Sequence, residues 1–370
     1  MLGRMPPRTP APSGVVLDMS PQSALVLRRP SPREVDETRL PTVYLSRELS
    51  PQLIHAQVGS GAWTRVRRGA YVATSVLTPD LTEHDRPRAS RRAGTSGPPS
   101  GPDHAARTAW DICTIAAVAR QVAPDVVFTH ESAASLWGLP LWRSTAAVHI
   151  NQRSLRSGHA SRDVARHSGR LDPSEVTRRS GLRVTSLERT VVDCARSSSA
   201  AAGLVVADAA LRRGVEREAL VSSLLGLGAA RGVRLARTVV ELADGGAESP
   251  WESVTRLVLL ATGVPAPSTQ VPVVTRLGTF FVDMGWAHWK VALEFDGLVK
   301  YTHLASGDPG RVIFDEKRRH DAIVEAGWRV VRVTRADLRP PEELRDRLLR
   351  VLPTGALDGL HPLPRLLHGL

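Results

Sequence analysis

The chain has 370 residues, of which 42% are hydrophobic, and it carries a formal net charge of +12 at pH 7. A chain of this length is expected to form two or three domains with real cores, and its basic balance favours polyanionic partners such as nucleic acid. The two cysteines, Cys113 and Cys194, lie outside any CxxC pair, which excludes a disulfide framework and indicates reduced, buried thiols. No run of 18 apolar residues and no charged-then-apolar leader occurs, so we expect a cytoplasmic protein that does not enter a membrane.

Residues 1–42 are rich in Pro, Arg and Ser and are expected to be mostly disordered. A small unit follows over residues 43–74, with a helix over Leu49–Val58 and a basic hairpin over Ala62–Val72. Residues 75–103 combine Pro, Gly and Ser with an arginine cluster, which is typical of a basic linker.

The hairpin sequence WTRVRRGAY (63–71) resembles the end of the winged-helix domain found at the N-terminus of abortive-infection type IV antitoxins. The resemblance implies that Arg65, Arg67 and Arg68 contact phosphates of nucleic acid. The first helices of a full winged helix are not evident upstream of Val43, so we interpret the unit as a remnant. The alternative is a solvated basic hairpin that only packs on the next domain.

Residues 104–245 are predicted to form an α+β middle domain that begins with an apolar helix over Ala105–Val122. The segments FTHESAASLWGLP (128–140) and GLRVTSLERTVVDCAR (181–196) resemble the C-terminal region of the same antitoxin family, which is linked to toxin neutralisation and DNA contacts. His130 and Glu131 are adjacent, but a strand end followed by a helix start explains both without catalysis. We therefore predict no acid, base or nucleophile constellation in this domain.

Residues 246–352 open with a helix whose N-terminus is marked by Ser249 as N-cap, Pro250 in the first position and Glu252 in the third, a capping-box pattern. Two apolar runs, Phe280–Val282 and Val291–Phe295, then flank a short polar break and indicate a β-hairpin. A polar helix and the strand Trp328–Val333 follow, so the predicted order is helix, three strands, helix, strand, helix.

A two-residue turn at His288 and Trp289 would place Asp283 directly opposite Glu294, with Asp296 on the same face. Like charges that face each other destabilise a sheet, so these carboxylates require a cation. Oxygen ligands of this kind suit Mg²⁺ or Mn²⁺. An ordinary turn at Asp296-Gly297 and a strand end at Asp283 are the simpler alternative.

Six segments in order then resemble the restriction-endonuclease-like domain of the PD-(D/E)xK superfamily, and within it the domains related to very-short-patch repair endonucleases. These segments are ESPWES (248–253), FVDMGW (281–286), VALEFDG (291–297), VKY (299–301), EKRRHD (316–321) and GWRVVRVTRADL (327–338). The resemblance implies that Asp283 and Glu294 are the core metal ligands and that Asp296 and Glu252 support them.

The lysine that usually follows the glutamate by two residues is absent, because Asp296 stands in that position. Lys300 or Lys317 would have to supply the amine, although Lys317 is equally well explained by an ion pair with Asp321 one turn further along the helix. A closing helix over Glu342–Val351 and a loose tail over 353–370 complete the chain.

We therefore predict an α+β protein with a restriction-endonuclease-like mixed sheet, which hydrolyses DNA phosphodiesters through a carboxylate-held Mg²⁺ or Mn²⁺. The alternative is an antitoxin-like DNA-binding regulator that has lost catalysis, or a partner that neutralises a toxin. The oligomeric state is left open.

Overall fold

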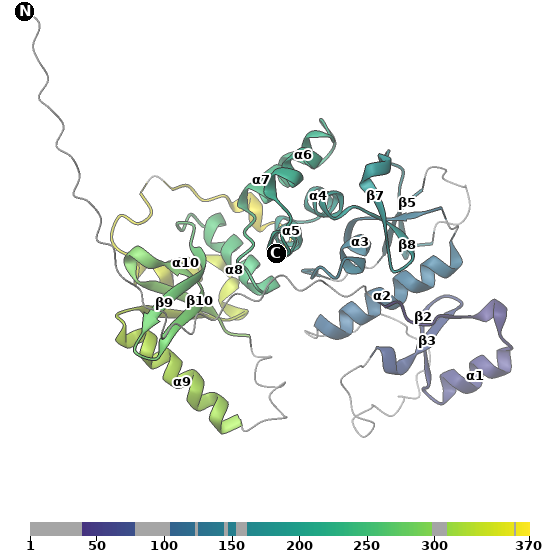
Figure 1. Cartoon of the computed structure of the whole chain (residues 1–370), viewed down its shortest axis with the longest axis horizontal. Helices are drawn as coiled ribbons and strands as arrows, with labels where there is room; N and C mark the ends of the chain where they lie inside the picture. Colours follow the sequence, from purple (N-terminus) through teal and green to yellow (C-terminus); the bar gives the residue numbers. More distant parts are fainter. Residues whose placement is uncertain are drawn as a thin grey trace, which may run out of the picture. The chain divides into compact units, whose positions relative to one another are not determined.

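The computed structural model describes residues 39–77, 104–122, 125–143, 147–152, 161–297, 309–358 and 360–370. These residues form ten α-helices and three β-sheets, so the chain has an α+β fold, as the sequence predicts (Figure 1). They all belong to one compact unit, Pro32–Leu370. The predictions for residues 1–38 and for most of the basic linker lie outside the described residues.

The first sheet has three strands in the order β1-β3-β2, and it packs on one long helix. Its elements are β1 (Tyr44–Leu45), α1 (Pro51–Gly59), β2 (Trp63–Arg67), β3 (Ala70–Ala73) and the supporting helix α2 (His104–Gln121). Gly69 makes the β2–β3 turn with φ of 72°, a left-handed conformation that glycine adopts without strain. Val66, Val72 and Cys113 share a buried cluster, so the predicted hairpin is packed against the helix that follows it.

The second sheet has five strands in the order β6-β5-β4-β8-β7, with a mixture of parallel and antiparallel pairs. Its strands are β4 (Val127–Phe128), β5 (Val148–Asn151), β6 (Val164–His167), β7 (Val176–Arg179) and β8 (Leu182–Thr185), and the short helix α3 (His130–Leu136) follows β4. Phe128, Ile150 and Val184 form its buried centre together with side chains of α2.

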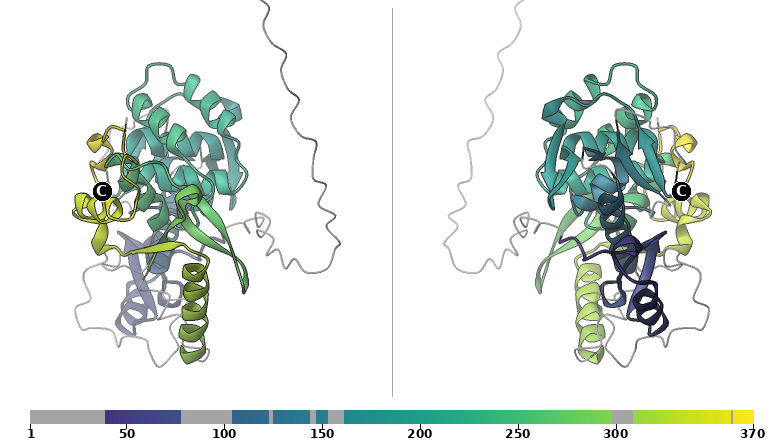
Figure 2. Two further views of the ribbon diagram at one scale, coloured as in Figure 1. Left: turned by 90° about the vertical axis from the view of Figure 1, so that its left-hand side faces the viewer. Right: turned by 90° about the vertical axis from the view of Figure 1, so that its right-hand side faces the viewer.

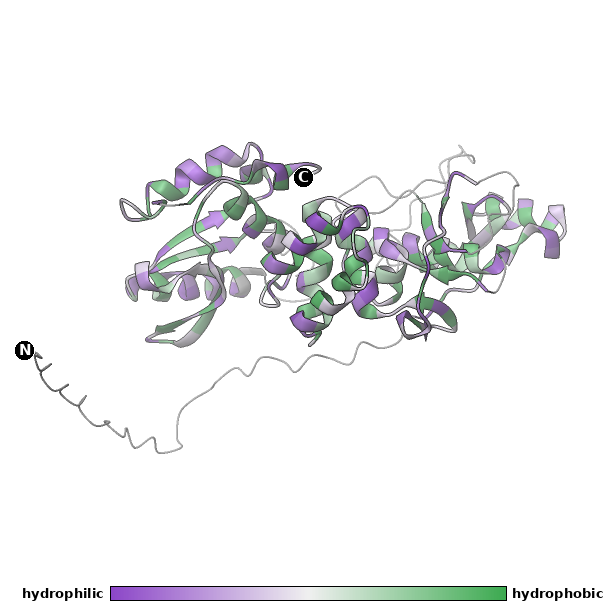
Figure 3. Ribbon diagram, turned by 90° about the horizontal axis from the view of Figure 1, so that it is seen from above, coloured by the Kyte–Doolittle hydropathy of each residue, from purple (hydrophilic) through white to green (hydrophobic). Residues whose placement is uncertain are grey.

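Four helices follow and pack against one another: α4 (Leu187–Ser197), α5 (Ala200–Arg212), α6 (Arg217–Leu225) and α7 (Val233–Leu242). Gly203 in α5 lies close to α4, because a Cβ added there would sit 2.8 Å from the Cα of Ala195. Apolar and polar residues both occur along these helices, as the hydropathy colouring shows (Figure 3). Their apolar sides build the largest buried cluster of the described residues.

The last region has the predicted order of one helix, three strands, a helix, a strand and a helix. Its elements are α8 (Pro250–Ala261), β9 (Ser268–Thr275), β10 (Gly278–Trp286), β11 (Val291–Phe295), α9 (Pro309–Glu325), β12 (Arg329–Val333) and α10 (Pro341–Leu349). The strands form one mixed sheet in the order β12-β11-β10-β9, in which β11 and β12 are parallel and the other pairs are antiparallel.

The two sides of this sheet pack on different helices (Figure 2). Met284, Leu293 and Val333 contribute to the largest cluster together with residues of α8 and α10. Val273 and Ala292 instead pack with Ile323 of α9. Strand residues therefore alternate between two buried faces, which explains why β11 reads as an uninterrupted apolar run apart from Glu294.

Three expectations about this region need correction. The β10–β11 turn spans four residues, because Ala287–Trp289 form a 3₁₀ turn and Lys290 has a left-handed φ of 51°. The boundary predicted at residues 245/246 lies within a shared core, where Arg256 of α8 pairs with Asp208 of α5 at 2.8 Å.

The segment 353–370 is not a loose tail. Leu366 is only 2% exposed within the largest cluster, and the backbone N–H of Leu363 donates to the carbonyl of Ala261 at 2.7 Å. Apolar side chains at the end of the chain therefore complete the core, which a composition rich in Pro and Leu does not reveal.

Both cysteines are free and buried, as predicted. Among the described helices, none combines the length and apolarity needed to span a membrane.

Candidate functional site

Asp283 and Glu294 lie on neighbouring strands in the predicted register. The structure pairs Met284 with Leu293 and Trp286 with Val291, so the next position along the ladder sets Asp283 against Glu294. The predicted turn, His288–Trp289, is two residues shorter than the observed turn, Ala287–Lys290. Both turns have the same centre, so the predicted pairing of the two strands is correct. Together with Glu252, these residues are called the carboxylate site below.

The carboxylate of Asp283 is bound to the backbone of the neighbouring strand. Its Oδ2 accepts a hydrogen bond of 2.7 Å from the N–H of Phe295. The β10–β11 pairing ends at Met284, so this side chain takes over a backbone donor where the ladder stops. Such a bond fixes the position of the carboxylate.

Glu252 reaches the site from the first turn of α8. Ser249 caps the helix and accepts from the N–H of Glu252, as predicted, but Oε2 of Glu252 accepts from the N–H of Glu248 at 2.8 Å instead of from the N-cap residue. Burial raises the pKa of Glu252 to about 7, and the charge of Asp283 adds to the rise. Glu252 and Asp283 are therefore close enough for their charges to repel, at the position where the resemblance implied a shared cation.

Glu294 is 9% exposed and forms an ion pair with Arg319 of α9. Nη2 of Arg319 donates to Oε1 of Glu294 at 2.6 Å and to the carbonyl of Phe281 at 3.0 Å. The guanidinium also lies over the ring of Phe280, 5.8 Å from its centroid. A cation of this protein thus already occupies part of the position that the sequence assigned to a metal.

Lys317 does not approach the carboxylates in the way the sequence allowed. It is exposed on α9, two residues before Arg319, a spacing that places the two side chains on nearly opposite sides of the helix. Among the described residues it makes no ion pair within 4.0 Å, so the predicted partner Asp321 is not bound. Lys300 lies outside the described residues. Asp296 is half-buried after β11, where its N–H donates to the carbonyl of Val333 at 2.8 Å.

Arg319 is the residue that sequence reasoning missed. Its position could have been found from helical spacing, because Ala322 and Ile323, three and four residues later, are both buried on the sheet side of α9. From the motif EKRRHD we considered only Lys317 as a catalytic residue. In the structure, Arg319 of the same motif is the residue that contacts Glu294.

A second polar group lies in the middle region, where we predicted no site. Within the described part of the chain, one set of three or more His, Cys, Asp or Glu side chains has all its ligand atoms within 4.8 Å of one another, namely His130, His149 and His167. The carboxylate site does not meet that condition. This group is called the histidine cluster.

The histidine cluster is assembled by the strand order and by a left-handed residue. His149 of β5 and His167 of β6 share a sheet face, because β5 and β6 pair with Asn151 opposite His167. His130 begins α3 with φ of 52°, which turns its side chain toward the same face. Nδ1 of His149 and Nε2 of His167 are 3.0 Å apart.

Burial lowers the pKa of all three histidines. For His130 the pKa falls to about 2, with the neighbouring His167 and His149 adding to the effect of burial. Burial also dominates the lowering at His149, against the opposing charge of Glu131, and at His167. The rings are therefore neutral at physiological pH.

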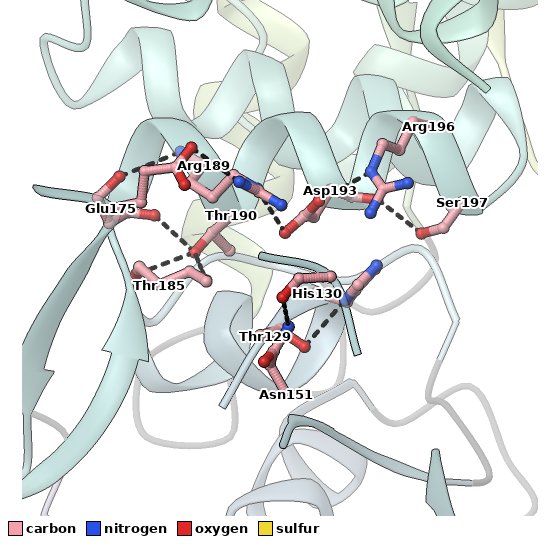
Figure 4. A network of polar contacts seen from close by, with 12 residues as sticks. Thr129, His130, Asn151, Glu175, Thr185, Arg189, Thr190, Asp193, Arg196 and Ser197 are labelled. Carbon is pink, nitrogen blue, oxygen red and sulfur yellow. Dashed lines mark hydrogen bonds and ion pairs between the residues drawn. The ribbon is translucent and has the colours of Figure 1, made fainter. Parts of the chain in front are cut away.

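Helix α4 carries an ion-pair network beside this cluster (Figure 4). Asp193 is 1% exposed, and its carboxylate accepts hydrogen bonds from Nε of Arg189 at 3.0 Å and from Nε of Arg196 at 2.8 Å. Arg189 also donates to Glu175 at 2.7 Å. These residues, named the α4 network, satisfy buried charge with opposite charge.

The basic hairpin at the N-terminal sheet divides its arginines between two roles. Arg67 is held by Asp163, at 2.5 Å, and by Gln121, at 2.6 Å, so its guanidinium serves the fold and the expected phosphate contact must be corrected. Arg65 and Arg68 are exposed. Both therefore remain candidates for contact with nucleic acid.

The chain is similar to two uncharacterized proteins of Mycobacterium tuberculosis, one from strain CDC 1551 / Oshkosh and one from strain H37Rv. Each is 29% identical over 231 residues, which cover 62% of this chain and 82% of the relative. No protein-family model and no solved structure matches the chain.

Proposed function

We propose that the protein is a metal-dependent endonuclease that hydrolyses phosphodiesters of DNA at the carboxylate site. The observation that supports this most is the register of β10 and β11, which sets Asp283 against Glu294 while α8 brings Glu252 beside Asp283. Acidic residues gathered from three elements, in a protein with net charge +12, indicate a role for a cation and an anionic substrate.

The donor set fits Mg²⁺ or Mn²⁺, because Asp283, Glu294 and Glu252 offer only carboxylate oxygens. The raised pKa of Glu252 fits as well, since two acidic groups in a buried setting lack sufficient positive charge. When bound, the ion supplies Lewis-acid stabilisation of the phosphoryl oxygens and lowers the pKa of a coordinated water. Asp296 is a further oxygen donor close by in the sequence.

The roles of the protein's own groups follow from their contacts. The N–H of Phe295 holds Asp283 in place, and the carbonyl of Phe281 orients Arg319. Arg319 is the cation that takes the place of the missing lysine, and its guanidinium can stabilise negative charge that develops on a phosphoryl group. Glu252, half-protonated near neutral pH, can exchange a proton within the site.

A second candidate is a DNA-binding regulator without catalysis. The ion pair between Arg319 and Glu294 favours it, because a carboxylate neutralised by an internal guanidinium needs no metal. In that case the exposed Arg65 and Arg68 would contact phosphates, and a toxin would be a further partner.

A cleavage assay separates the two functions. Supercoiled plasmid and single strands are incubated with the full chain in Mg²⁺, Mn²⁺ or EDTA, beside Glu294→Gln and Asp283→Asn. The matched control is Glu325→Gln, which removes an exposed carboxylate of α9 that pairs with the exposed Arg276. The nuclease is expected to cut only with metal, and both site variants are expected to lose at least about 100-fold in rate.

The opposite result has an equally definite meaning. If the wild type and the Glu325→Gln control cut nothing but bind DNA with an affinity that falls steeply with salt, the regulator is the function. Equal cutting by wild type and Glu294→Gln would show that any nuclease activity lies elsewhere.

A further inference from the structure

The histidine cluster lies apart from the carboxylate site and uses different chemistry. His149 and His167 come from two adjacent parallel strands, and His130 comes from the start of the helix that follows β4. The ring centroids of His130 and His167 are 3.9 Å apart, and those of His149 and His167 are 5.2 Å apart. Three imidazoles from three elements therefore converge at one end of the second sheet.

The separations of the ring nitrogens are those of a coordination shell. Nδ1 of His149 and Nε2 of His167 are 3.0 Å apart, and one nitrogen of His130 lies within 4.8 Å of both. Two nitrogens bound to one tetrahedral Zn²⁺ at 2.0–2.1 Å would be about 3.3 Å apart. The rings of His130 and His167 are stacked with an angle of 18° between their planes, so their rotation is required to aim the lone pairs at a common ion.

Two of the outward-facing nitrogens lie near side-chain oxygens, an arrangement common for metal-bound histidines. Nε2 of His149 lies 3.7 Å from Oε2 of Glu131, and Nδ1 of His130 lies 2.9 Å from Oγ1 of Thr129. Oε1 of Glu131 accepts from the hydroxyl of Ser198. These contacts leave Nδ1 of His149 and Nε2 of His130 to face the interior of the cluster.

The surroundings also retain unneutralised negative charge. Oε2 of Glu131 is buried and has no hydrogen-bond partner among the described residues. Asp193 is paired with Arg189 and Arg196, whereas Glu131 has no arginine or lysine in ion-pair distance among the described residues. A divalent cation held by the three rings would compensate the charge of Glu131.

We propose that His130, His149 and His167 bind a divalent transition-metal ion, and that Zn²⁺ is the ion that the site fits best. Nδ1 of His149, Nε2 of His167 and Nε2 of His130 are its ligands, and Glu131 orients the ring of His149 from outside. Nitrogen donors of this type select Zn²⁺ and its neighbours in the first transition row over Mg²⁺. The fourth position is filled by water or another small ligand.

The proton balance of binding is simple. In the tautomer of neutral His149 that carries its proton on Nε2, on the side of Glu131, the hydrogen bond between the two rings is donated by Nε2 of His167. When the ion binds, the proton of this hydrogen bond leaves Nε2 of His167, and that ring takes up a proton on Nδ1. No further group has to change its charge.

Binding of Co²⁺ tests the proposal, because tetrahedral Co²⁺ has much more intense visible absorption bands than Co²⁺ in an octahedral oxygen site. The full chain is stripped with EDTA, titrated with Co²⁺ and then displaced with Zn²⁺. One ion per chain with tetrahedral bands is expected. His167→Gln is expected to lower the affinity by more than about 100-fold, and Glu131→Gln, which keeps all three rings, by about 10- to 100-fold.

Three controls make the result decisive. His288→Gln removes an exposed histidine and is expected to leave the Co²⁺ titration unchanged. Asp283→Asn is also expected to leave the bands unchanged, because it alters only the carboxylate site. Circular dichroism verifies that His167→Gln is folded, and Glu131→Gln provides an independent measurement if it is not. Absence of tetrahedral bands in the wild type, or equal affinity in wild type and both cluster variants, would overturn the proposal.

Discussion

The carboxylate site and the α4 network both bury acidic groups, but they balance the charge in different ways. Asp193 in the α4 network lies between two arginines, at 3.0 and 2.8 Å. In the carboxylate site, Asp283 and Glu252 accept backbone N–H groups, and Arg319 pairs with Glu294. A network with matched charges fixes a fold, whereas a site with surplus acid is poised to accept a cation or a proton.

The largest expected effect comes from removing the central charge of the α4 network. Asp193→Asn keeps the shape of the side chain but leaves the buried Arg189 with Glu175 alone and the half-buried Arg196 without its ion-pair partner. We expect the free energy of unfolding to fall by about 3 kcal/mol, because removing one member of a buried ion pair exposes the desolvation cost of the other. Urea denaturation followed by circular dichroism measures the change.

The same measurement on Glu325→Gln provides the comparison. Both members of the Glu325–Arg276 pair are more than half exposed, so the expected change is below about 1 kcal/mol. Equal losses in the two variants would contradict the assignment of the α4 network as a structural element.

The contribution of Glu252 to the free energy of unfolding of the protein is expected to fall as pH rises. The unfolded carboxyl of Glu252 releases its proton near the ordinary pKa of 4.5, whereas burial and Asp283 hold the proton in the folded state to about pH 7. The folded state binds more protons between these values, so the free energy of unfolding falls by about 3 kcal/mol across that window. Glu252→Gln is expected to remove this slope and to be the more stable protein at pH 8.

Urea denaturation at several pH values, in EDTA, checks this difference. The exposed Glu218→Gln serves as the control and is expected to run parallel to the wild type. A Glu252→Gln protein with the pH slope of the wild type would show that the carboxyl is charged in the folded state at neutral pH.

The histidine cluster is expected to respond to pH in the opposite direction. Burial and the two neighbouring histidines lower the pKa of His130 to about 2. The unfolded state therefore binds a proton at this residue near pH 6.5, whereas the folded state does not. The contribution of His130 to the free energy of unfolding therefore falls as the solution is acidified, by about 2 kcal/mol at pH 5.

His130→Asn tests this slope, since asparagine tolerates the left-handed backbone at this position. Its stability is expected to depend less on pH between 7 and 5 than that of the wild type, when both are measured without metal. His55→Asn, at an exposed position of α1, is the control. A His130→Asn protein with the same pH dependence as the wild type would show that His130 is not a neutral, buried ring.

The smallest expected effect concerns the competition between Arg319 and a metal for Glu294. Arg319→Gln removes a positive charge 2.6 Å from Oε1 of Glu294, so the affinity for Mn²⁺ is expected to rise by about tenfold. Electron paramagnetic resonance of free Mn²⁺ measures the affinity. Arg318→Gln, a neighbouring exposed arginine, is expected to change it little, and equal affinities in the two variants would show that Arg319 does not compete.

The sequence predicted most where the determining pattern is local. The spacing of apolar residues set the register of Asp283 against Glu294, and the order of elements in the last region follows from caps and alternation around Ser249 and Val291. The four-residue turn was missed because Lys290 adopts a left-handed conformation that lysine seldom adopts.

The rest depended on contacts between distant segments. His149 and His167 meet only because β5 and β6 pair in parallel, and nothing in either segment specifies that partner. The local sequence around Arg67 predicts a surface arginine, because its partner Asp163 lies nearly a hundred residues later in the chain. The activity itself stays a prediction, because the family resemblance rests on motifs and the geometry shows a carboxylate already paired with Arg319.

The burial of Leu366 also bears on how the protein is made. The cluster that it enters begins with residues around Ala134, so the helices of the middle region keep an uncovered apolar patch until Leu366 has left the ribosome. Folding during synthesis can form the sheets in order, but the largest core can close only after this segment emerges. A nascent chain that stalls before Leu366 would therefore present that patch to chaperones and proteases, and a short deletion at this end would resemble a core mutation more than the removal of a tail.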